Sequence, residues 1–322
     1  MTSSKKSDYS LKGSRVWVPG SSGMLGSAVV RQLMAEDCEI ITGTRRDADL
    51  RDQAATRRLM EDFRADVVVL CAATVGGIKA NIARPVDFIF DNLAIEQNII
   101  ETAHRLDINR LIFFGSSCMY PREAAQPIQE NSIMTGPLEP TNEAYAIAKL
   151  AGLSLIKSFR RQYSRSYITA IPTNLYGPGD HFRSEDSHVV AAMLDRYHLA
   201  VIEGRAADPI WGSGKAQREF LYVDDAANAV VHLLKLYDDE EPINIAGGED
   251  LTIFELAQIV ANAVGYSGDI KCDESKPDGM ALKALDPTMI NSIGWFARTS
   301  FSEGIQNTYN DYKRFCVGQI AG

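Results

Sequence analysis

The sequence has few cysteines and no long hydrophobic run. None of its apolar stretches reaches the roughly 18 consecutive residues of a membrane-spanning helix, so we expect no membrane span. The five cysteines are odd in number and lack the spacing of metal ligands, which favours a reduced compartment without a metal site or disulfide framework. The first 13 residues are polar and lack the apolar core of a signal peptide, so we expect a disordered tail over residues 1–13 and a cytoplasmic protein.

Positive charge is also in short supply. With 33 lysines and arginines against 42 acidic residues, the formal net charge is −9, which argues against a nucleic-acid-binding surface. A few placed cations can still bind a small anion, because local fields outweigh a distant global charge. The 45% hydrophobic and 23% charged content is ordinary for a soluble globular protein, and 322 residues suffice for one large or two medium domains.

A glycine-rich turn lies near the N-terminus. Residues 15–19 are typical of a short buried strand, and residues 27–35 of a helix with an apolar stripe. A turn with evenly spaced glycines between strand and helix is the context of a dinucleotide-binding loop, because backbone amides can approach a pyrophosphate at the helix N-terminus. A tight turn without a ligand is the alternative. We assign to this loop Gly20, Ser22, Gly23, Met24, Leu25 and Gly26.

The next strand, residues 38–42, indicates which cofactor would bind. A ribose 2′-hydroxyl usually meets an acidic side chain at the end of this strand, whereas a 2′-phosphate meets arginine. Glu39 stands too early in the strand to reach the ribose, and Arg45 and Arg46 follow its end. The pattern therefore favours NADP(H) over NAD, although both arginines could instead be solvated in a surface turn. Asp49 and Leu50 follow and could close over the adenine.

Continuous apolar runs at residues 65–73 and 108–114 are typical of central parallel strands. They alternate with helical segments at residues 52–63 and 92–106, which predicts an α/β fold with a Rossmann-type doubly wound parallel sheet. Ligands bind such sheets beyond the carboxyl ends of the strands. Gly20, Ala72 and Ser116 all emerge at that edge.

Tyr145 and Lys149 are four residues apart, so on a helix they share one face. A free phenol has a pKa near ~10, and a cation one turn away favours the phenolate, which makes the tyrosine a usable proton donor and acceptor. The same spacing at Tyr309 and Lys313 lacks a glycine loop or serine before it, and we interpret it as a solvated helix face. Tyr145 is favoured because its helix follows the strand that ends at Ser116.

The composition shifts after a strand at residues 167–173, which we expect to be the last of the cofactor sheet. Residues 174–186 are typical of a long binding loop, and a helix follows with Ser187 as a plausible N-cap and His188 in its first turn. Residues 226–236 predict a helix that packs back on the cofactor domain. We therefore assign residues 14–172 plus about 217–241 to an NADP-binding Rossmann domain, and residues 173–216 plus 242–322 to a smaller α/β substrate domain.

These motifs resemble the extended short-chain dehydrogenase/reductases from about residue 15 to 314, and within them the enzymes that act on GDP-4-keto-6-deoxy sugars. The resemblance implies NADPH-dependent 3,5-epimerisation and 4-reduction of GDP-4-keto-6-deoxy-D-mannose to GDP-L-fucose. It also implies a homodimer formed through helices near residues 92–106 and 145–162. The stretches that carry the resemblance are residues 72–77, 115–121, 138–149, 172–178, 211–214, 218–225 and 275–279.

The resemblance assigns roles to individual residues. Ser116, Tyr145 and Lys149 correspond to the family's reductive set, and Cys118 and His188 to its acid/base pair. From the residues alone, Cys118 could be an inert thiol and His188 a surface or core histidine. The implied cofactor contacts add Ala72, Ala73, Tyr145, Lys149, Pro172, Asn174, Leu175 and His188. The implied GDP-sugar contacts are Ser116, Cys118, Asn174, His188, Arg196, Trp211, Arg218 and Lys283.

Two positions depart from the family pattern. Ser22 stands where the glycine loop often has an arginine, and Leu282 stands where an arginine often precedes the equivalent of Lys283. A related GDP-deoxysugar of the colitose or deoxyheptose type is therefore an alternative substrate. A non-catalytic NADP-binding regulator is a further alternative, against which the intact set of Ser116, Tyr145 and Lys149 argues.

Overall fold

The core of the protein is a parallel six-stranded sheet with the strand order β2-β1-β3-β4-β5-β9. The computed structural model describes residues 7–182, 187–276 and 280–320. The strand order reverses between β1 and β3, and ligands of doubly wound sheets bind at such a point. The six strands are β1 (Arg15–Trp17), β2 (Glu39–Ile41), β3 (Val67–Leu70), β4 (Arg110–Phe114), β5 (Ser166–Pro172) and β9 (Ile243–Ile245).

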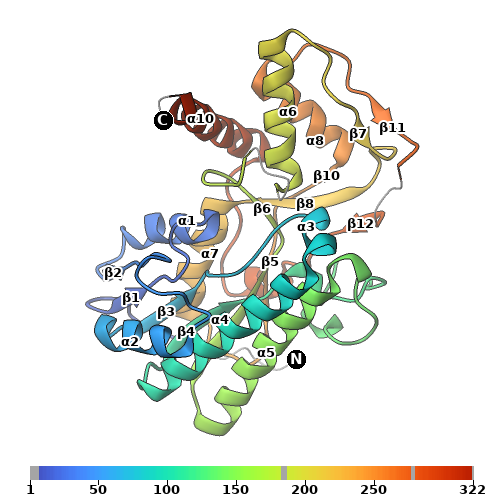
Figure 1. Cartoon of the computed structure of the whole chain (residues 1–322). Coiled ribbons are helices and arrows are strands. Elements are labelled where there is room, and N and C mark those ends of the chain that lie inside the picture. The colour runs from blue at the N-terminus through green and yellow to red at the C-terminus, as the bar shows by residue number, and fades with distance from the viewer. Residues whose placement is uncertain (1–6, 183–186, 277–279, 321–322) are drawn as a thin grey trace.

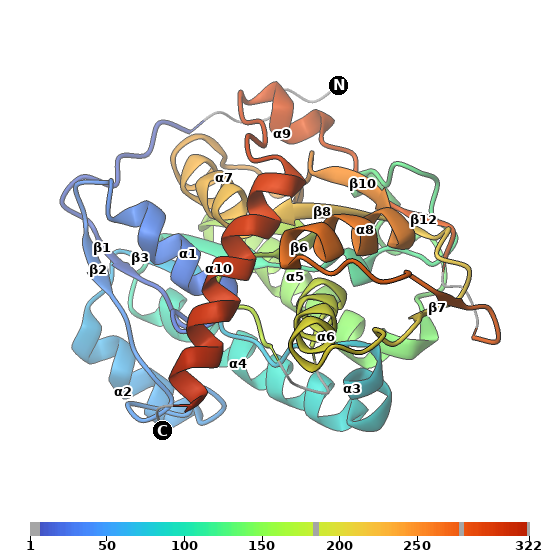
Figure 2. The ribbon, with the colours of Figure 1, turned by 90° about the horizontal axis from the view of Figure 1, so that it is seen from above.

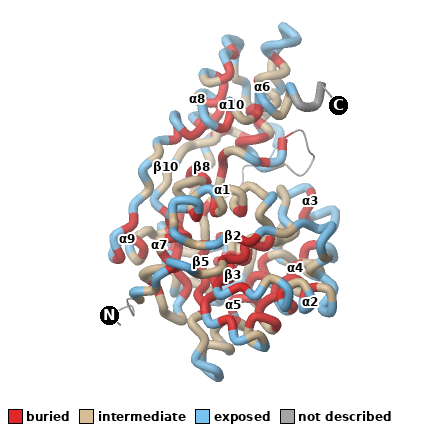
Figure 3. The backbone as a smooth tube through the Cα atoms, turned by 90° about the vertical axis from the view of Figure 1, so that its left-hand side faces the viewer, coloured by how far each residue is buried: buried red, intermediate tan, exposed pale blue. Residues whose placement is uncertain are grey.

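Helices cover both faces of this sheet (Figure 1). Strand β3 shows why, because Val67 and Val69 belong to the core beneath α1 and α7, whereas Val68 and Leu70 belong to the core beneath α2, α4 and α5. Figure 3 shows the buried residues concentrated in the strands and on the inward faces of the helices. The predicted Rossmann-type α/β fold is confirmed. The helices are α1 (Met24–Leu33), α7 (Val223–Leu236), α2 (Gln53–Phe63), α4 (Pro85–Arg105) and α5 (Glu143–Tyr163).

A second sheet, with its own hydrophobic core, lies beyond the carboxyl edge of the first (Figures 1 and 2). Only Thr173 separates β5 from its first strand, so the chain enters this unit directly from the edge where ligands bind. Its strands are β6 (Asn174–Tyr176), β8 (Gln217–Tyr222), β10 (Glu249–Thr252) and β12 (Leu282–Lys283), with β7 (Ile210–Trp211) paired to β11 (Cys272–Asp273). Its helices are α6 (Val189–Glu203), α8 (Ile253–Val264) and α10 (Phe301–Ile320).

Smaller elements complete the chain. They are α3 (Ile78–Ala83), α9 (Thr288–Ser292) and the 3-10 turns η1 (Ser117–Met119), η2 (Glu130–Ser132) and η3 (Pro140–Asn142). Within the described residues, no helix is long and apolar enough to cross a membrane, and no cluster of three potential metal ligands occurs.

The expected disordered tail is wrong for residues 7–13, which pack on α7. The backbone nitrogens of Ser7 and Tyr9 donate to the carbonyl oxygens of Leu236 and Lys235 at 3.0 and 2.9 Å, and Leu11 is only 2% exposed. Residues 1–6 of that tail lie outside the described residues. The interpretation of Tyr309 as part of a solvated helix face is also wrong, because Tyr309 is 9% exposed and its hydroxyl hydrogen-bonds Nδ1 of His198 at 2.9 Å.

The placement of three elements also differs from the expectations. Strand β9 pairs with β5, so the strand near residues 167–173 is not the last of the cofactor sheet. Strand β8 belongs to the second sheet, although we expected residues 217–241 to lie in the Rossmann domain; the helix that follows, α7, does pack against α1. The N-cap of α6 is His188 instead of Ser187, whose hydroxyl donates to the carbonyl oxygen of His181 at 2.7 Å.

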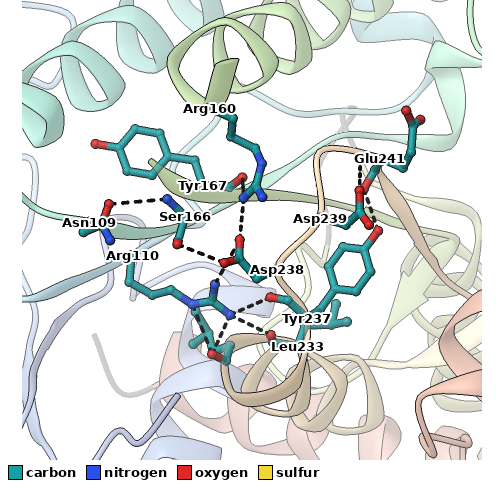
Figure 4. A network of polar contacts seen from close by, with 11 residues as sticks. Asn109, Arg110, Arg160, Ser166, Tyr167, Leu233, Tyr237, Asp238, Asp239 and Glu241 are labelled. Carbon is teal, nitrogen blue, oxygen red and sulfur yellow. Dashed lines mark hydrogen bonds and ion pairs between the residues drawn. The ribbon is translucent and has the colours of Figure 1, made fainter. Parts of the chain in front are cut away.

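A buried arginine joins three elements at the amino end of the sheet (Figure 4). Arg110, at the start of β4, donates to the carbonyl oxygens of Leu233, Leu234 and Tyr237 at 3.1, 2.6 and 2.7 Å. The last carbonyl groups of a helix lack partners within the helix, so this guanidinium satisfies the C-terminus of α7. Asp238 accepts at 2.6 Å from Arg160 of α5, which ties that helix to the same point.

We predict that Arg110→Met lowers the free energy of unfolding by about 1–3 kcal/mol, because it leaves buried carbonyl oxygens at the end of α7 without a donor. Chemical denaturation measures the change. The control Arg57→Met removes an exposed guanidinium that pairs with Glu61 on α2, and it should alter the free energy by less than about 0.5 kcal/mol. Equal effects of the two substitutions would contradict the role of Arg110.

Candidate active site

The glycine loop packs tightly against its neighbours at the point where the strand order reverses. A Cβ atom at Gly20, whose φ is +84°, would lie 2.6 Å from the backbone nitrogen of Ala72 after β3. A Cβ atom at Gly26 would lie 2.1 Å from the carbonyl oxygen of Gly20. Only glycine fits at either position. The turn therefore lies directly against the backbone of Ala72 and the start of α1.

This loop fits the diphosphate of a dinucleotide. The N-terminus of α1 has no side-chain cap at Gly23 and no acidic residue in its first turn, so nothing there opposes an anion. Ser22 is exposed. The neighbouring loop after β3 is fixed by Asn92 of α4, which accepts from the amide of Thr74 and donates to its carbonyl oxygen, both at 2.9 Å. That loop carries Ala72 and Ala73.

Arg45 and Arg46 lie exposed in the turn after β2. Asp47 shapes this turn by accepting from the backbone nitrogen of Thr44 at 2.7 Å. Arg51 hydrogen-bonds the carboxylate of Asp49 at 2.7 Å and, more than any other group, lowers the pKa of Asp49 to about 2, with a smaller contribution from the charge of Arg45. The turn therefore offers two exposed cations beside the glycine loop's strand.

Ser116 and Tyr145 meet at the carboxyl end of β4. Ser116 caps the short turn η1, and its hydroxyl oxygen accepts from the backbone nitrogen of Cys118 at 3.3 Å. The pKa of Tyr145 is raised by burial, and then by the charges of Cys118 and Glu96, whereas its hydrogen bond with Ser116 lowers it. The net direction is upward, so the phenol holds its proton near neutral pH.

Lys149 forms a buried ion pair with Glu96 of α4, and Glu96 is a residue that the sequence analysis missed. Its Nζ lies 3.0 Å from Oε1 of Glu96, and only 3% of Lys149 and 1% of Glu96 are exposed. The ammonium also lies 4.9 Å from the ring centroid of Phe113 and 5.8 Å from that of Tyr145. Burial raises the pKa of Glu96, and Lys149 opposes that shift. Lys149, which we expected to act on Tyr145 and to contact the cofactor, thus also has a counter-ion.

Cys118 and His188 each have a partner that the sequence analysis did not identify. The side-chain amide of Asn142 donates to Sγ of Cys118 at 3.0 Å. His188 is exposed at the start of α6 and interacts electrostatically with the buried carboxyl of Asp180. Burial raises the pKa of Asp180, and His188 opposes that shift. Asn142 ends η3 and Asp180 lies in the loop after β6, and the sequence does not reveal how either segment packs.

The second unit brings two of the predicted substrate-binding cations side by side. Arg218 of β8 and Lys283 of β12 are register partners on adjacent parallel strands, so their side chains share a face. Like charges in such a pair repel, and an anion between them would relieve the repulsion. Burial lowers the pKa of Arg218, whose Nη1 donates to the carbonyl oxygen of Met280 at 2.6 Å.

The other predicted substrate residues lie along the same unit. Arg196 of α6 donates to the carbonyl oxygen of Pro209 at 3.3 Å and so supports β7. Trp211 of β7 is 59% exposed, and Nζ of Lys79 on α3 lies 5.1 Å from its ring centroid. Asn174 of β6 donates to the carbonyl oxygen of Glu219 at 2.8 Å. Pro172 and Leu175 flank Asn174 on β5 and β6.

Residues 16–246 match the NAD dependent epimerase/dehydratase family. The GDP-L-fucose synthase of Sinorhizobium fredii is 47% identical over 304 residues, covering 94% of this chain and 97% of that protein. The GDP-L-colitose synthase of Yersinia pseudotuberculosis is 34% identical and covers 91% of this chain and 96% of that protein. The structure of a GDP-L-fucose synthetase from Naegleria fowleri bound to NADP is 27% identical, with a TM-score of 0.89, and covers 98% of this chain and 99% of that chain.

The fold is that of an extended short-chain dehydrogenase/reductase, and the resemblance is confirmed. The chain belongs to the NAD dependent epimerase/dehydratase family. A nicotinamide dinucleotide is therefore its cofactor.

We predict that Gly152→Ala disturbs the contact between α5 and α4. A Cβ atom there would lie 2.5 Å from Oε2 of Glu96 and 2.4 Å from Cζ of Phe113. Alanine normally stabilises a helix relative to glycine by about 1 kcal/mol, whereas overpacking destabilises by about 1–3 kcal/mol. Denaturation should show a net loss of stability. The control Ser154→Ala, exposed on the same helix, should show little change, and a Gly152→Ala protein as stable as the wild type would refute the close packing.

Proposed function

We propose that the chain catalyses the NADPH-dependent 3,5-epimerisation and 4-reduction of GDP-4-keto-6-deoxy-D-mannose to GDP-L-fucose. The observation that carries the proposal is the meeting of Ser116, Tyr145 and Lys149 at the carboxyl edge of the sheet, with Cys118 beside them. The identity of 47% to a GDP-L-fucose synthase supports it, and the 34% identity to a GDP-L-colitose synthase makes that substrate class the alternative.

The reduction needs a proton at O4 of the sugar. The hydroxyl groups of Ser116 and Tyr145 would both hydrogen-bond O4, and the phenol would give its proton to that oxygen. The raised pKa of Tyr145 suits this role, because a donor must hold its proton until the reaction. Bound NADPH would supply the hydride to C4. Lys149 would orient the nicotinamide ribose from below Tyr145.

The epimerisations need a base and an acid near C3 and C5. The 4-keto group makes the protons at both carbons acidic, because the charge of each carbanion spreads onto O4. Ser116 and Tyr145 would stabilise that charge where it develops. Cys118 and His188 would remove and return the protons, with Asn142 donating to the thiol sulfur and Asp180 interacting electrostatically with the imidazole.

Binding is divided between the two units. Arg45 and Arg46 would hold the 2′-phosphate, which favours NADP(H) over NAD. Arg218 and Lys283 would hold the diphosphate of the GDP-sugar, whose charge offsets their mutual repulsion. Ala72, Ala73, Pro172, Asn174 and Leu175 would line the nicotinamide end, and Arg196 and Trp211 the nucleotide end of the substrate.

Turnover in deuterated water tests this proposal. We predict that GDP-4-keto-6-deoxymannose and NADPH give GDP-fucose with deuterium at C3 and C5, because both centres exchange protons with the enzyme. Cys118→Ser and His188→Asn should each slow epimerisation by about 10²-fold or more, and Tyr145→Phe should slow NADPH oxidation by a similar factor.

Each alternative predicts a different outcome of that experiment. Reduction without label would remove the epimerase roles of Cys118 and His188. Failure to consume this substrate, with turnover of a related GDP-4-keto sugar, would favour the colitose or deoxyheptose type. A Tyr145→Phe protein with unchanged biological activity would favour a non-catalytic regulator.

We also propose that the chain forms a homodimer through α4 and α5. Large apolar side chains stand exposed along this region, and isolated monomers rarely expose several together. Val86 and Phe90 lie one turn apart on α4 and are 69% and 67% exposed. Ile147 of α5 is 42% exposed. A second copy would cover these side chains.

We predict that Phe90→Glu converts the dimer to a monomer, because a buried unpaired carboxylate is strongly unfavourable at an interface. Analytical ultracentrifugation measures the mass. Met34, the C-cap of α1, is 75% exposed, and the matched control Met34→Glu should leave the dimer intact. A monomeric wild-type protein, or a dimeric Phe90→Glu variant, would contradict the proposed interface.

A further inference from the structure

The carboxylate of Glu96 has one polar contact among the described residues, the ion pair with Lys149. Apart from the Lys149 contact, neither oxygen of Glu96 has a hydrogen-bond partner among the described residues. Glu219, another buried carboxylate, differs because its oxygens accept from the backbone nitrogens of Gly247, Gly248 and Leu285 and so organise loops. Glu96, in contrast, accepts no hydrogen bond from a backbone nitrogen of the described residues. A charge buried in this way is unfavourable unless it is paired, so its place in α4 depends on Lys149.

Three elements form a socket around the ammonium of Lys149. Glu96 comes from α4, Phe113 from β4, and Gly152 of α5 leaves the space that the carboxylate fills. The spacing of helix positions places Lys149 one turn beyond Tyr145. The socket therefore fixes the ammonium at a set position below the phenol.

The charges around Tyr145 come from few groups. Lys149 lies 5.8 Å from the centroid of its ring, Glu96 pairs with Lys149, and Cys118 acts on it from η1, with the Ser116 hydroxyl as hydrogen-bond partner. Burial also raises the pKa of the Cys71 thiol, in the residue after β3, and Lys149 opposes that shift. An unpaired ammonium near the phenol would favour the phenolate. The pKa of Tyr145 is raised first by burial and then by Cys118, and the charge of Glu96 raises it further, so this carboxylate opposes the effect of the ammonium.

We propose that Glu96 is a positioning residue that holds Lys149 in its socket and neutralises its charge, so that Tyr145 rests as a proton-donating phenol. The proposal rests on the reduction assigned above, in which Tyr145 gives a proton to O4. A resting phenolate would suit the reverse oxidation, where the tyrosine accepts a proton. Glu96 thus adapts a tyrosine–lysine pair, which can serve either direction, to reduction.

The pH dependence of reduction in Glu96→Gln tests the proposal. Reduction requires the phenol, so its rate falls as the pH rises through the pKa of Tyr145. Loss of the carboxylate leaves the charge of Lys149 without a counter-ion and lowers the pKa of Tyr145. The basic limb of the pH–rate profile should therefore shift to lower pH by about one pH unit or more. The matched control is Glu101→Gln on the same helix, where the carboxylate pairs with Arg105 at the surface; its profile should equal the wild type's.

A second readout does not depend on turnover. Alkaline titration of the free protein, followed by tyrosinate absorbance, should show one tyrosine ionising about one pH unit earlier in Glu96→Gln than in Glu101→Gln. The early step should vanish in the double variant with Tyr145→Phe. Equal titrations and equal rate profiles in the two glutamine variants would overturn the proposal and leave Glu96 a structural residue.

Glu96→Asp provides a variant that keeps the charge if Glu96→Gln does not fold. We expect a lower reduction rate, because the shorter side chain draws Lys149 from its position, with the basic limb unmoved. If the basic limb of the pH–rate profile shifts to lower pH in Glu96→Asp, Glu96 does not act by neutralising the charge of Lys149. A wild-type protein that does not turn over any GDP-4-keto sugar would end the proposed function instead, and the tyrosinate titration would still test Glu96.

Discussion

The ion pair between Lys149 and Glu96 is the contact on which the candidate site depends. Two charged groups are removed from water there, which is unfavourable unless their geometry is well kept. The contact between α4 and α5 keeps that geometry, and Gly152 makes it possible by leaving out a side chain. Tyr145 lies on the same helix as Lys149, so the position of the phenol follows from the same packing.

The two ends of the parallel strands have different roles: the amino edge carries stabilising contacts, and the carboxyl edge carries the candidate site. At the amino edge, Arg110 and Asp238 tie α7, β4 and α5 together with buried polar contacts. At the carboxyl edge, glycines at positions 20 and 26 bring backbone close to backbone and leave a helix N-terminus without a side-chain cap. The hydrogen bonds at the amino edge therefore hold the helices in place. The backbone N–H groups at the N-terminus of α1 leave donors for a ligand at the carboxyl edge, where ligands of such sheets bind.

Local patterns in the sequence predicted the fold and much of the site. The glycine spacing, the continuous apolar strands and the spacing of Tyr145 and Lys149 all act over a few residues, and the structure has each in the expected element. Glu96 could not be found as the partner of Lys149, because their contact joins two helices far apart in the chain. Asp180 is close to His188 in the sequence, but no local pattern shows that the two side chains interact. The one sequence signal for a buried carboxylate was the position of Glu96, which follows Ile95 on the apolar side of α4. Strand β9 has three residues, too few to show a period.

The most direct test of the account is the structure of the protein with NADP(H) and a GDP-sugar bound. We predict that the hydroxyl groups of Ser116 and Tyr145 both lie within hydrogen-bond distance of the sugar O4, about 2.5–3.0 Å. The nicotinamide C4 should face the sugar C4, and Lys149 should keep its contact with Glu96. A Tyr145 hydroxyl turned away from Ser116 and the sugar, or a Lys149 released from Glu96, would contradict the account.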